Sequence, residues 1–308
     1  MEFKEFGWRF TEMLVPKEWE LAADGAGAKY AYFRLDDSFR PRLEVRWDRV
    51  EPKKAPSPRR NVEKFLSDIE KHFSKRLKRQ YKLKRLGLRE VKIANHEACM
   101  FHVRDESGNE VVGVSWYCPD TRRMFIVQGF TLGKEYSAFK KTFDKVLSSF
   151  VCHKKEPWLW NVYGLRFKTP EGYRLEGRNL RSPYARLTFS RNDFWFIVAY
   201  HGMANILFEE EYTSLLDWFR RMYVKDAFKP LGRTAIRTSY DIAVKGHHGL
   251  KIVSATRLSL FKKLIVDTYL WLCDRVNRII VVSFAYPEKM YSAVKDEMNS
   301  LLDSVLCH

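Results

Sequence analysis

Alternating apolar and polar positions predict β-strands at several places in the chain. Residues 30–35 and 42–47 alternate on either side of the turn-forming residues 36–38, which indicates a β-hairpin. The same pattern predicts strands at 91–94, 97–104, 110–118 and 123–131. Neighbouring strands joined by short turns pair antiparallel, so we expect a mostly antiparallel sheet.

Two stretches have helical spacing instead. A helix is expected from Asn61, as its N-cap, to about Tyr81, and a second is expected over 135–151. Their apolar stripes are Val62, Leu66, Ile69, Phe73 and Leu77 in the first, and Phe139, Phe143, Val146, Leu147 and Phe150 in the second. Further helices are expected near 212–223 and 288–306. Helices packed on an antiparallel sheet define an α+β architecture.

The second half of the chain repeats the first. Shifted by 155 positions, 116–153 and 271–308 share 13 identities in 38 ungapped positions. The matches include Trp116-x-Cys118 with Trp271-x-Cys273, and Cys152-His153 with Cys307-His308. A repeat of this length predicts a tandem duplication of one module, with copies at 1–153 and 154–308.

Short motifs in both copies resemble the PsbP/DcrB-like superfamily. They are an aromatic strand leading into a proline motif, a turn in mid-module, and a last helix ending in a Leu-x-Ser pattern. The residues are Phe10, Pro16, Trp19, Asn95, Leu147, Ser149 and Phe150, then Phe167, Pro170, Tyr173, Gly246, Leu302 and Ser304. That superfamily includes an extrinsic photosystem II protein and a Ran-binding nuclear import factor. The resemblance implies a partner-binding role without catalysis. The Cys-His ends and the basicity depart from its pattern, so its partners do not carry over.

Composition narrows the class of protein. Hydrophobic residues make up 45% and charged residues 30% of the 308, an ordinary globular profile. There is neither a signal-peptide pattern at the start nor an apolar stretch of roughly 18 residues, so we expect a cytoplasmic protein without a membrane span. Its oligomeric state is not encoded in any pattern.

The chain is strongly basic in both halves. The net charge is +17, from 31 minus 22 charges in residues 1–153 and 24 minus 16 in 154–308. Such a field attracts polyanions, of which nucleic acid is the commonest in the cytoplasm. A thermophile-like surface rich in Lys and Arg is the alternative.

The densest cations follow a proline-rich loop and continue along the first helix. Helical spacing places Lys64, Lys71, Lys75, Lys78 and Lys82 on one stripe opposite the apolar face. The predicted nucleic-acid contacts are Lys53, Lys54, Arg59, Arg60, Lys64, Lys71, Lys75, Lys78, Arg79, Lys82, Lys84 and Arg85. Tyr81 is a candidate for stacking on unpaired bases. A solvated helix face is the alternative.

Cysteine and histidine side chains converge if the strands pair as expected. If Arg104 and Glu110 are paired at the turn of the first hairpin, the residue numbers of every opposite pair add up to 214. His96 then lies opposite Cys118. In the second copy the residue numbers of His247 and Cys273 add up to 520. If these two residues are paired, the turn of that hairpin is centred on Leu260. The last helix returns Cys152 and His153 to the first cluster, and Cys307 and His308 to the second.

Three interpretations of these clusters remain open. The thiols are buried as small apolar groups, or they form the disulfides Cys118–Cys152 and Cys273–Cys307. The third is one structural zinc per module, held by His96, Cys118, Cys152 and His153, and by His247, Cys273, Cys307 and His308. No Cys-x-x-Cys spacing supports a zinc finger, and no other cofactor is indicated.

No catalytic motif is present: the chain lacks a phosphate-binding loop, a Gly-x-Ser-x-Gly elbow and a His-Glu-x-x-His helix. We therefore expect a non-enzymatic basic protein that contacts structured RNA by shape and backbone. Ribosome association is expected only because ribosomal RNA is so abundant. A protein-partner scaffold of the PsbP-like kind is the alternative function.

Overall fold

The computed structural model describes residues 1–155, 157–170, 172–257 and 263–308. It separates into two compact units, Met1–Val162 (unit 1) and Tyr163–His308 (unit 2). The boundary falls after Val162 rather than after His153, because β10 (Trp158–Val162) pairs antiparallel with β1 (Phe3–Trp8). A Cβ atom on Gly7 of β1 would lie 2.1 Å from the carbonyl oxygen of Leu159, so this close approach requires glycine.

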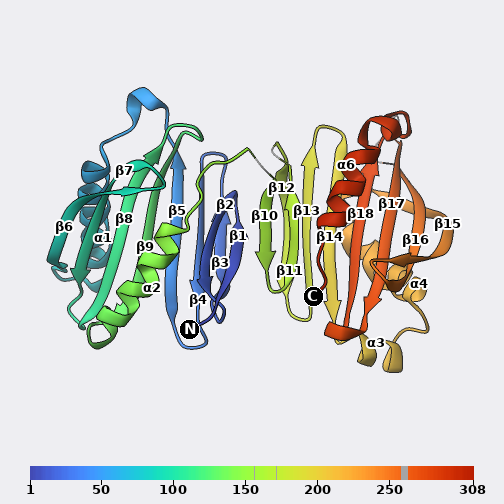
Figure 1. The fold of residues 1–308 in the computed structure, drawn as a ribbon, viewed down its shortest axis with the longest axis horizontal. Coiled ribbons are helices and arrows are strands. Elements are labelled where there is room, and N and C mark those ends of the chain that lie inside the picture. Colours follow the sequence, from blue (N-terminus) through green and yellow to red (C-terminus); the bar gives the residue numbers. More distant parts are fainter. Residues whose placement is uncertain (156, 171, 258–262) are drawn as a thin grey trace. The chain divides into compact units, whose positions relative to one another are not determined.

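Unit 1 is built on a seven-stranded antiparallel sheet (Figure 1). Its strands, in spatial order, are β3 (Glu20–Ala26), β4 (Tyr30–Asp36), β5 (Pro41–Arg49), β9 (Arg123–Leu132), β8 (Asn109–Cys118), β7 (His96–Arg104) and β6 (Lys84–Ile93). β1 also pairs with β2 (Thr11–Pro16) beside this sheet. The hairpins predicted from alternation are confirmed, whereas alternation did not predict β1, β2 and β3.

Two helices lie on opposite faces of the sheet in unit 1 (Figure 1). α1 (Pro58–Leu77) packs on β7 and β8, and α2 (Tyr136–Ser148) packs on β2 and β9. α1 begins earlier than predicted, because Ser57 rather than Asn61 is its N-cap: the Ser57 hydroxyl accepts from the Arg60 N–H.

The far end of α1 also differs from the prediction. The helix stops at Leu77, and Lys78 adopts the left-handed conformation with φ of 53°. Only the first half of the predicted apolar stripe is buried: Val62 and Leu66 pack with Cys99, Phe101 and Val103. Phe73 and Leu77 are 36% and 45% exposed, which leaves the second half of the stripe near solvent.

Unit 2 repeats the strand order of unit 1. Its sheet runs β12 (Arg174–Arg181), β13 (Tyr184–Arg191), β14 (Phe194–Gly202), β18 (Arg278–Tyr286), β17 (Lys263–Cys273), β16 (His247–Arg257) and β15 (Arg233–Val244). β11 (Leu165–Thr169) precedes the sheet, and α6 (Tyr291–Ser304) packs on β11 and β18. The α+β class and the tandem duplication are therefore confirmed.

The helical layer of unit 2 is more broken than predicted. The helix expected near 212–223 is α4 (Leu215–Trp218), followed by a π-helical turn at Phe219–Tyr223 and by α5 (Val224–Ala227). An unpredicted helix, α3 (Ala204–Glu210), precedes them. Large buried rings from this layer fill the core, among them Trp218, Phe219 and Tyr223. Leu260, the expected centre of the second hairpin, lies outside the described residues.

Candidate metal centres and basic surface

The register of β7 and β8 brings the first histidine and cysteine together. Ala98 pairs with Trp116, and Arg104 pairs with Glu110. Both pairs have the predicted register, in which the residue numbers add up to 214. Continuing this register by two residues beyond Ala98 places His96 opposite Cys118. In unit 2 Gly249 pairs with Trp271, so the predicted register of 520 also holds.

The chain after α2 is fixed at the same end of the sheet by backbone and side-chain hydrogen bonds. Ser149 Oγ accepts from the Leu14 N–H at 2.8 Å, and Val151 forms a β-bridge with Glu12. The guanidinium of Arg123 is buried and donates to the carbonyl oxygen of Cys152. These bonds hold Cys152 and His153 beside the hairpin end.

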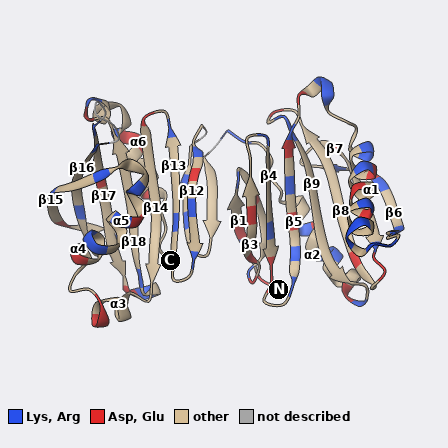
Figure 2. Ribbon diagram, turned by 180° about the vertical axis from the view of Figure 1, so that it is seen from behind, with Lys and Arg blue, Asp and Glu red and all other residues tan. Residues whose placement is uncertain are grey.

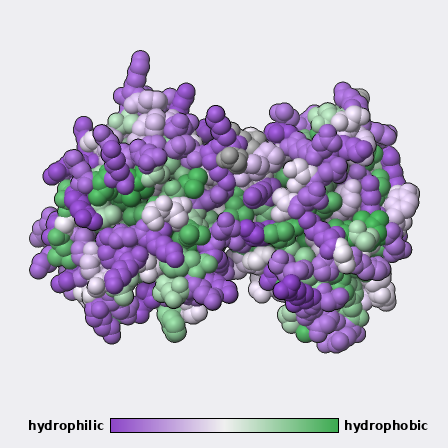
Figure 3. Space-filling view, in the orientation of Figure 1, coloured by the Kyte–Doolittle hydropathy of each residue, from purple (hydrophilic) through white to green (hydrophobic). Residues whose placement is uncertain are grey.

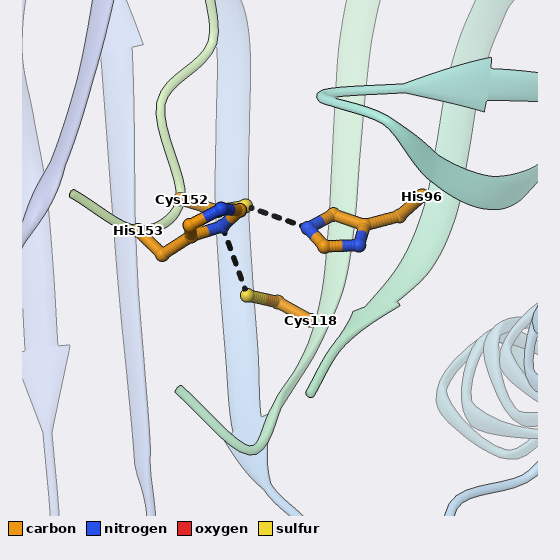
Figure 4. Close-up of side chains that lie close together, drawn as sticks. All are labelled: His96, Cys118, Cys152 and His153. Atoms are coloured by element: carbon orange, nitrogen blue, oxygen red, sulfur yellow. Dashed lines mark hydrogen bonds between the residues drawn. The ribbon is translucent and has the colours of Figure 1, made fainter. Parts of the chain in front are cut away.

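The four side chains of unit 1 point toward one another (Figure 4). Cys152 Sγ lies 3.4 Å from His96 Nε2 and 3.3 Å from His153 Nδ1. Cys118 Sγ lies 3.4 Å from His153 Nδ1. Both sulfurs are buried, the imidazoles are half-buried, and all four potential ligand atoms lie within 4.8 Å of one another.

Unit 2 contains the same arrangement. Cys307 Sγ lies 3.5 Å from His247 Nε2 and 3.2 Å from His308 Nδ1, and Cys273 Sγ lies 3.4 Å from His308 Nδ1. The chain after α6 is held by equivalent bonds: Ser304 Oγ accepts from the Lys168 N–H, and Leu306 bridges to Arg166. The structure therefore brings the eight residues that the sequence singled out into two clusters of four, one in each unit.

The two thiols of unit 1 differ in acidity. The Cys152 thiol donates to Cys118, and this hydrogen bond lowers the pKa of Cys118 to about 4 despite its burial. The same bond, together with burial, raises the pKa of Cys152, while the indole N–H of Trp116 and the Arg123 cation oppose the rise. In unit 2 burial is the main cause that raises the pKa of Cys273. The hydrogen bond between the two sulfurs thus acts in opposite directions on the pKa values of the two thiols.

All five cysteines are free thiols in the structure, so none forms a disulfide. Four of them belong to the two clusters. Cys99, the fifth, is buried beneath α1. Two thiol and two imidazole groups form a closed set of four donors, the composition that structural zinc sites use. Such a set leaves no coordination position for a substrate.

The predicted basic residues are all exposed. Figure 2 shows blue Lys and Arg positions along α1. Lys53 and Lys54 lie on a 3-10 turn, and α1 carries Arg59, Arg60, Lys64, Lys71 and Lys75. Lys78, Arg79 and Lys82 follow the helix, and Lys84 and Arg85 open β6. We call these twelve residues the basic surface. The predicted stripe was wrong at its end: Lys78 and Lys82 lie beyond the helix, which stops at Leu77.

Acidic neighbours neutralise only part of the basic surface. Glu63 pairs with Arg59, Glu106 with Arg79, and Glu70 with Arg85 at 3.2 Å and Lys82 at 4.0 Å. In the described parts of the chain the other eight cations form no ion pair: Lys53, Lys54, Arg60, Lys64, Lys71, Lys75, Lys78 and Lys84. Tyr81 does not project freely, because its ring packs on Phe73 at 5.1 Å between centroids.

A cavity beside α1 was not foreseen. It measures 580 Å³ and is lined by apolar side chains of α1, by β-strand side chains, and by the carboxyl group of Glu44. Burial raises the pKa of Glu44, and the Gln128 amide donates to this carboxyl group at 2.8 Å. The matching register pair of unit 2 is Ile197 and Ser283, in a face filled by aromatic rings. Alternation alone placed Glu44 on an outer face.

In the view of Figure 3, the surface of each unit is mostly hydrophilic and carries smaller hydrophobic patches. Among the described residues, no helix is long and apolar enough to cross a membrane.

Comparisons with known proteins indicate similarity in fold. No protein-family model and no curated protein sequence matches the chain. Cyanobacterial PsbP (CyanoP) from Synechocystis is 14% identical with a TM-score of 0.38, covering 49% of this chain and 92% of its own. The Ran-binding protein Mog1p of Saccharomyces cerevisiae is 9% identical with a TM-score of 0.32, covering 50% and 96%.

A third structure covers both units. The immunity protein TplEi of Pseudomonas aeruginosa, complexed with a peptide, is 10% identical with a TM-score of 0.34, covering 98% of this chain and 96% of its own. One of these structures, CyanoP, is of the PsbP kind that the sequence motifs resemble. At these identities the similarity concerns the fold alone.

Proposed function

We propose that this protein is a non-enzymatic binding protein of the cytoplasm that holds structured RNA against the basic surface of unit 1. One observation carries the proposal: eight cations of that surface are exposed and have no acidic partner among the described residues. An uncompensated cationic surface releases counterions when it meets a polyanion, which is the main source of affinity for nucleic acid.

The geometry of α1 supports contact with phosphates. Lys64, Lys71 and Lys75 lie within about 20° of one line along the helix, about 10 and 6 Å apart at 1.5 Å per residue. The opposite side of the helix carries Val62 and Leu66, which fix it to the sheet. A rigid row of point charges suits recognition of an RNA backbone rather than of base edges.

Absence of catalysis is part of the same proposal. In both units the cysteine and histidine ligand atoms face one another, and the sulfurs are buried. A buried thiol held in this way is turned away from any substrate, so these cysteines are not placed to act as nucleophiles. The clusters support the fold instead of reacting.

The test is fluorescence anisotropy with a labelled RNA stem-loop. We expect wild-type affinity to fall steeply between 50 and 200 mM salt, by about 0.7 to 0.9 log units in affinity per log unit of salt for each phosphate contact. The triple variant K64E/K71E/K75E should lose binding and lower the salt slope by about 2 to 3.

A matched control changes the same number of charges elsewhere on unit 1. Lys29, Lys134 and Lys141 are exposed and lie outside the basic surface. The variant K29E/K134E/K141E should keep the wild-type salt slope and lose little affinity. Equal losses in the two triple variants would show that net charge, and not the α1 surface, binds RNA.

A second candidate function follows from β6. This ten-residue strand is an edge of the sheet and pairs only with β7 among the described strands. An acidic protein segment could add to its open side as a further strand, next to Arg89 and Lys92. Lysine-rich edges also serve to prevent such pairing, which is why this function ranks second. Binding of an acidic strand-forming peptide, lost in R89E, together with no RNA binding at 50 mM salt, would replace the first proposal by this one.

A further inference from the structure

We propose that each unit binds one Zn²⁺ in a Cys₂His₂ centre. In unit 1 the ligands are His96 Nε2, Cys118 Sγ, Cys152 Sγ and His153 Nδ1, and in unit 2 they are His247 Nε2, Cys273 Sγ, Cys307 Sγ and His308 Nδ1. Both centres stand on geometry and donor chemistry, independently of whether the basic surface binds RNA.

The distances fit a tetrahedral ion. With Zn–S of about 2.3 Å and Zn–N of about 2.0–2.1 Å, a tetrahedron has sulfur-to-nitrogen edges of about 3.5 Å. The sulfur-to-nitrogen distances in unit 1 are 3.4, 3.4 and 3.3 Å. Three edges of the cluster therefore already match those of a zinc coordination sphere, and all four ligand atoms lie within 4.8 Å of one another.

The duplication tests the geometry a second time. Both units present Nε2 of the hairpin histidine and Nδ1 of the histidine that follows the second cysteine. The imidazole pairs differ in tilt, at 58° and 89° between ring planes, so packing does not impose a single arrangement. The ligand atoms are what the two clusters share. A common ligand explains why the same atoms converge twice.

Groups around the ligands supply the outer contacts that metal sites need. His153 Nε2, the nitrogen turned away from the sulfurs, lies 3.8 Å from the carboxylate of Asp120. The indole N–H of Trp116 faces the Cys152 sulfur. A metal-bound thiolate is a stronger acceptor than a thiol, so it would strengthen this contact.

The donor set selects the metal and its role. Two thiolates and two neutral imidazoles balance the charge of a divalent ion, and soft sulfur with imidazole in a tetrahedron is typical of zinc. Each centre would join three separate segments: the start of β7 or β16, the end of β8 or β17, and the chain after α2 or α6. We therefore assign the ions a structural role.

The first experiment measures bound metal in the purified full-length chain. We expect two zinc ions per chain, one in C118S/C152S and one in C273S/C307S. Cys99→Ser is the matched control, because Cys99 is a buried thiol outside both clusters and its loss should leave two ions.

A second measurement covers loss of metal during purification: the metal-free protein is titrated with Co²⁺. Tetrahedral d–d absorption and a sulfur-to-cobalt charge-transfer band should saturate at two ions. No zinc together with no such Co²⁺ spectrum would overturn the proposal.

A conservative variant separates coordination from a merely structural hydrogen bond. His308 is exposed, so its replacement should leave the fold of unit 2 intact. We expect H308A to weaken Co²⁺ binding in unit 2 by at least tenfold, and H308C to restore it with a stronger charge-transfer band from the third sulfur. If H308A and H308C bind Co²⁺ as wild type does, His308 is not a ligand and the Cys₂His₂ assignment fails.

Discussion

Cys152 Sγ lies 3.4 Å from His96 Nε2, although 56 residues separate the two along the chain. Two independent constraints produce this contact: the β7–β8 register fixes His96, and the hydrogen bonds of the segment after α2 fix Cys152. Because neither constraint involves the other, a ligand that joins the two side chains would add to the stability of unit 1 by linking them.

Asp120 should strengthen metal binding in unit 1 only. Its carboxylate lies 3.8 Å from His153 Nε2, whereas the repeat-matched position in unit 2 is Arg275. Outer carboxylates orient a ligating imidazole and raise its basicity, and their loss typically costs about 10- to 100-fold in affinity. We expect about tenfold for D120N, because Asp120 is exposed.

The measurement is competition with a chromophoric chelator, which resolves two ions of different affinity. Wild type and D120N should differ in one site and agree in the other. The variant R275D is the reciprocal change, and it should tighten the weaker site. A D120N effect on both sites, or on neither, would contradict the role given to Asp120.

Ser149 should matter for stability through one hydroxyl group. Its Oγ accepts from the Leu14 N–H at 2.8 Å and donates to the Val146 carbonyl at 2.9 Å. S149A leaves the Leu14 N–H without this acceptor, which should cost about 1 to 2 kcal/mol in urea denaturation. S148A is the control, since the neighbouring Ser148 hydroxyl is exposed. If S148A loses as much stability as S149A does, the role given to the Ser149 hydroxyl is refuted.

The sequence predicted the register of the central hairpins because their turns and alternation leave little choice. Arg104 and Glu110 flank a turn that contains Gly108, and shifting the pairing by one residue would turn the buried face outward. The same register then determines where His96 and Cys118 meet. This part of the candidate site could therefore be predicted without a structure.

The pattern of apolar and polar positions did not predict the early strands, because the turn between β1 and β2 lacks the usual turn residues. Arg9 and Phe10 join β1 to β2 with φ of 53° and 58°, a conformation that glycine or asparagine normally marks. In the same way Lys78 ends α1 in the left-handed region, so no glycine marked the end of the helix. Tertiary packing decides the backbone conformation at both places.

The burial of Glu44 could not be predicted for a related reason. The cavity over Glu44 exists only because of the position of α1, which the strand pattern does not specify.

Glu110 should stabilise unit 1 at neutral pH. It is 2% exposed and accepts from His102 Nε2 at 2.8 Å and from the Arg104 guanidinium. Burial alone would raise its pKa, but these two hydrogen bonds outweigh burial and lower the pKa below the ordinary 4.5. A lowered pKa means that the stabilisation is present above about pH 4.5 and is lost as the pH falls through the folded-state value.

We expect E110Q to lose about 2 kcal/mol at pH 7, because hydrogen bonds to a charged group are replaced by neutral ones. The difference from wild type should shrink below pH 4.5 in urea denaturation. Glu106 is the control: it is an exposed partner of Arg79, so E106Q should change stability much less than E110Q does. A pH-independent E110Q effect would mean that lost packing, and not lost charge, is responsible.

Glu44 should have the opposite effect on stability. Burial under α1 raises its pKa above 4.5, against the weaker opposing influence of the Gln128 amide and two arginines. A raised pKa means that its contribution is fully present below about pH 4.5 and is lost as the pH rises through the folded-state value. E44Q removes the ionisation while keeping an oxygen that accepts from Gln128. We therefore expect E44Q to be more stable than wild type at pH 7 and equal to it near pH 4.

Each comparison is made at a single pH, so metal release on acidification affects both proteins alike and cancels in the difference. Glu90, exposed on β6, provides the control E90Q, for which a change within about 0.5 kcal/mol is expected at either pH. If E44Q is less stable than wild type at pH 7, the ionised carboxylate is better stabilised in the folded cavity than in solvent. The charges of Arg34 and Arg46 would then outweigh burial, or a bound cation in the 580 Å³ cavity would add to them.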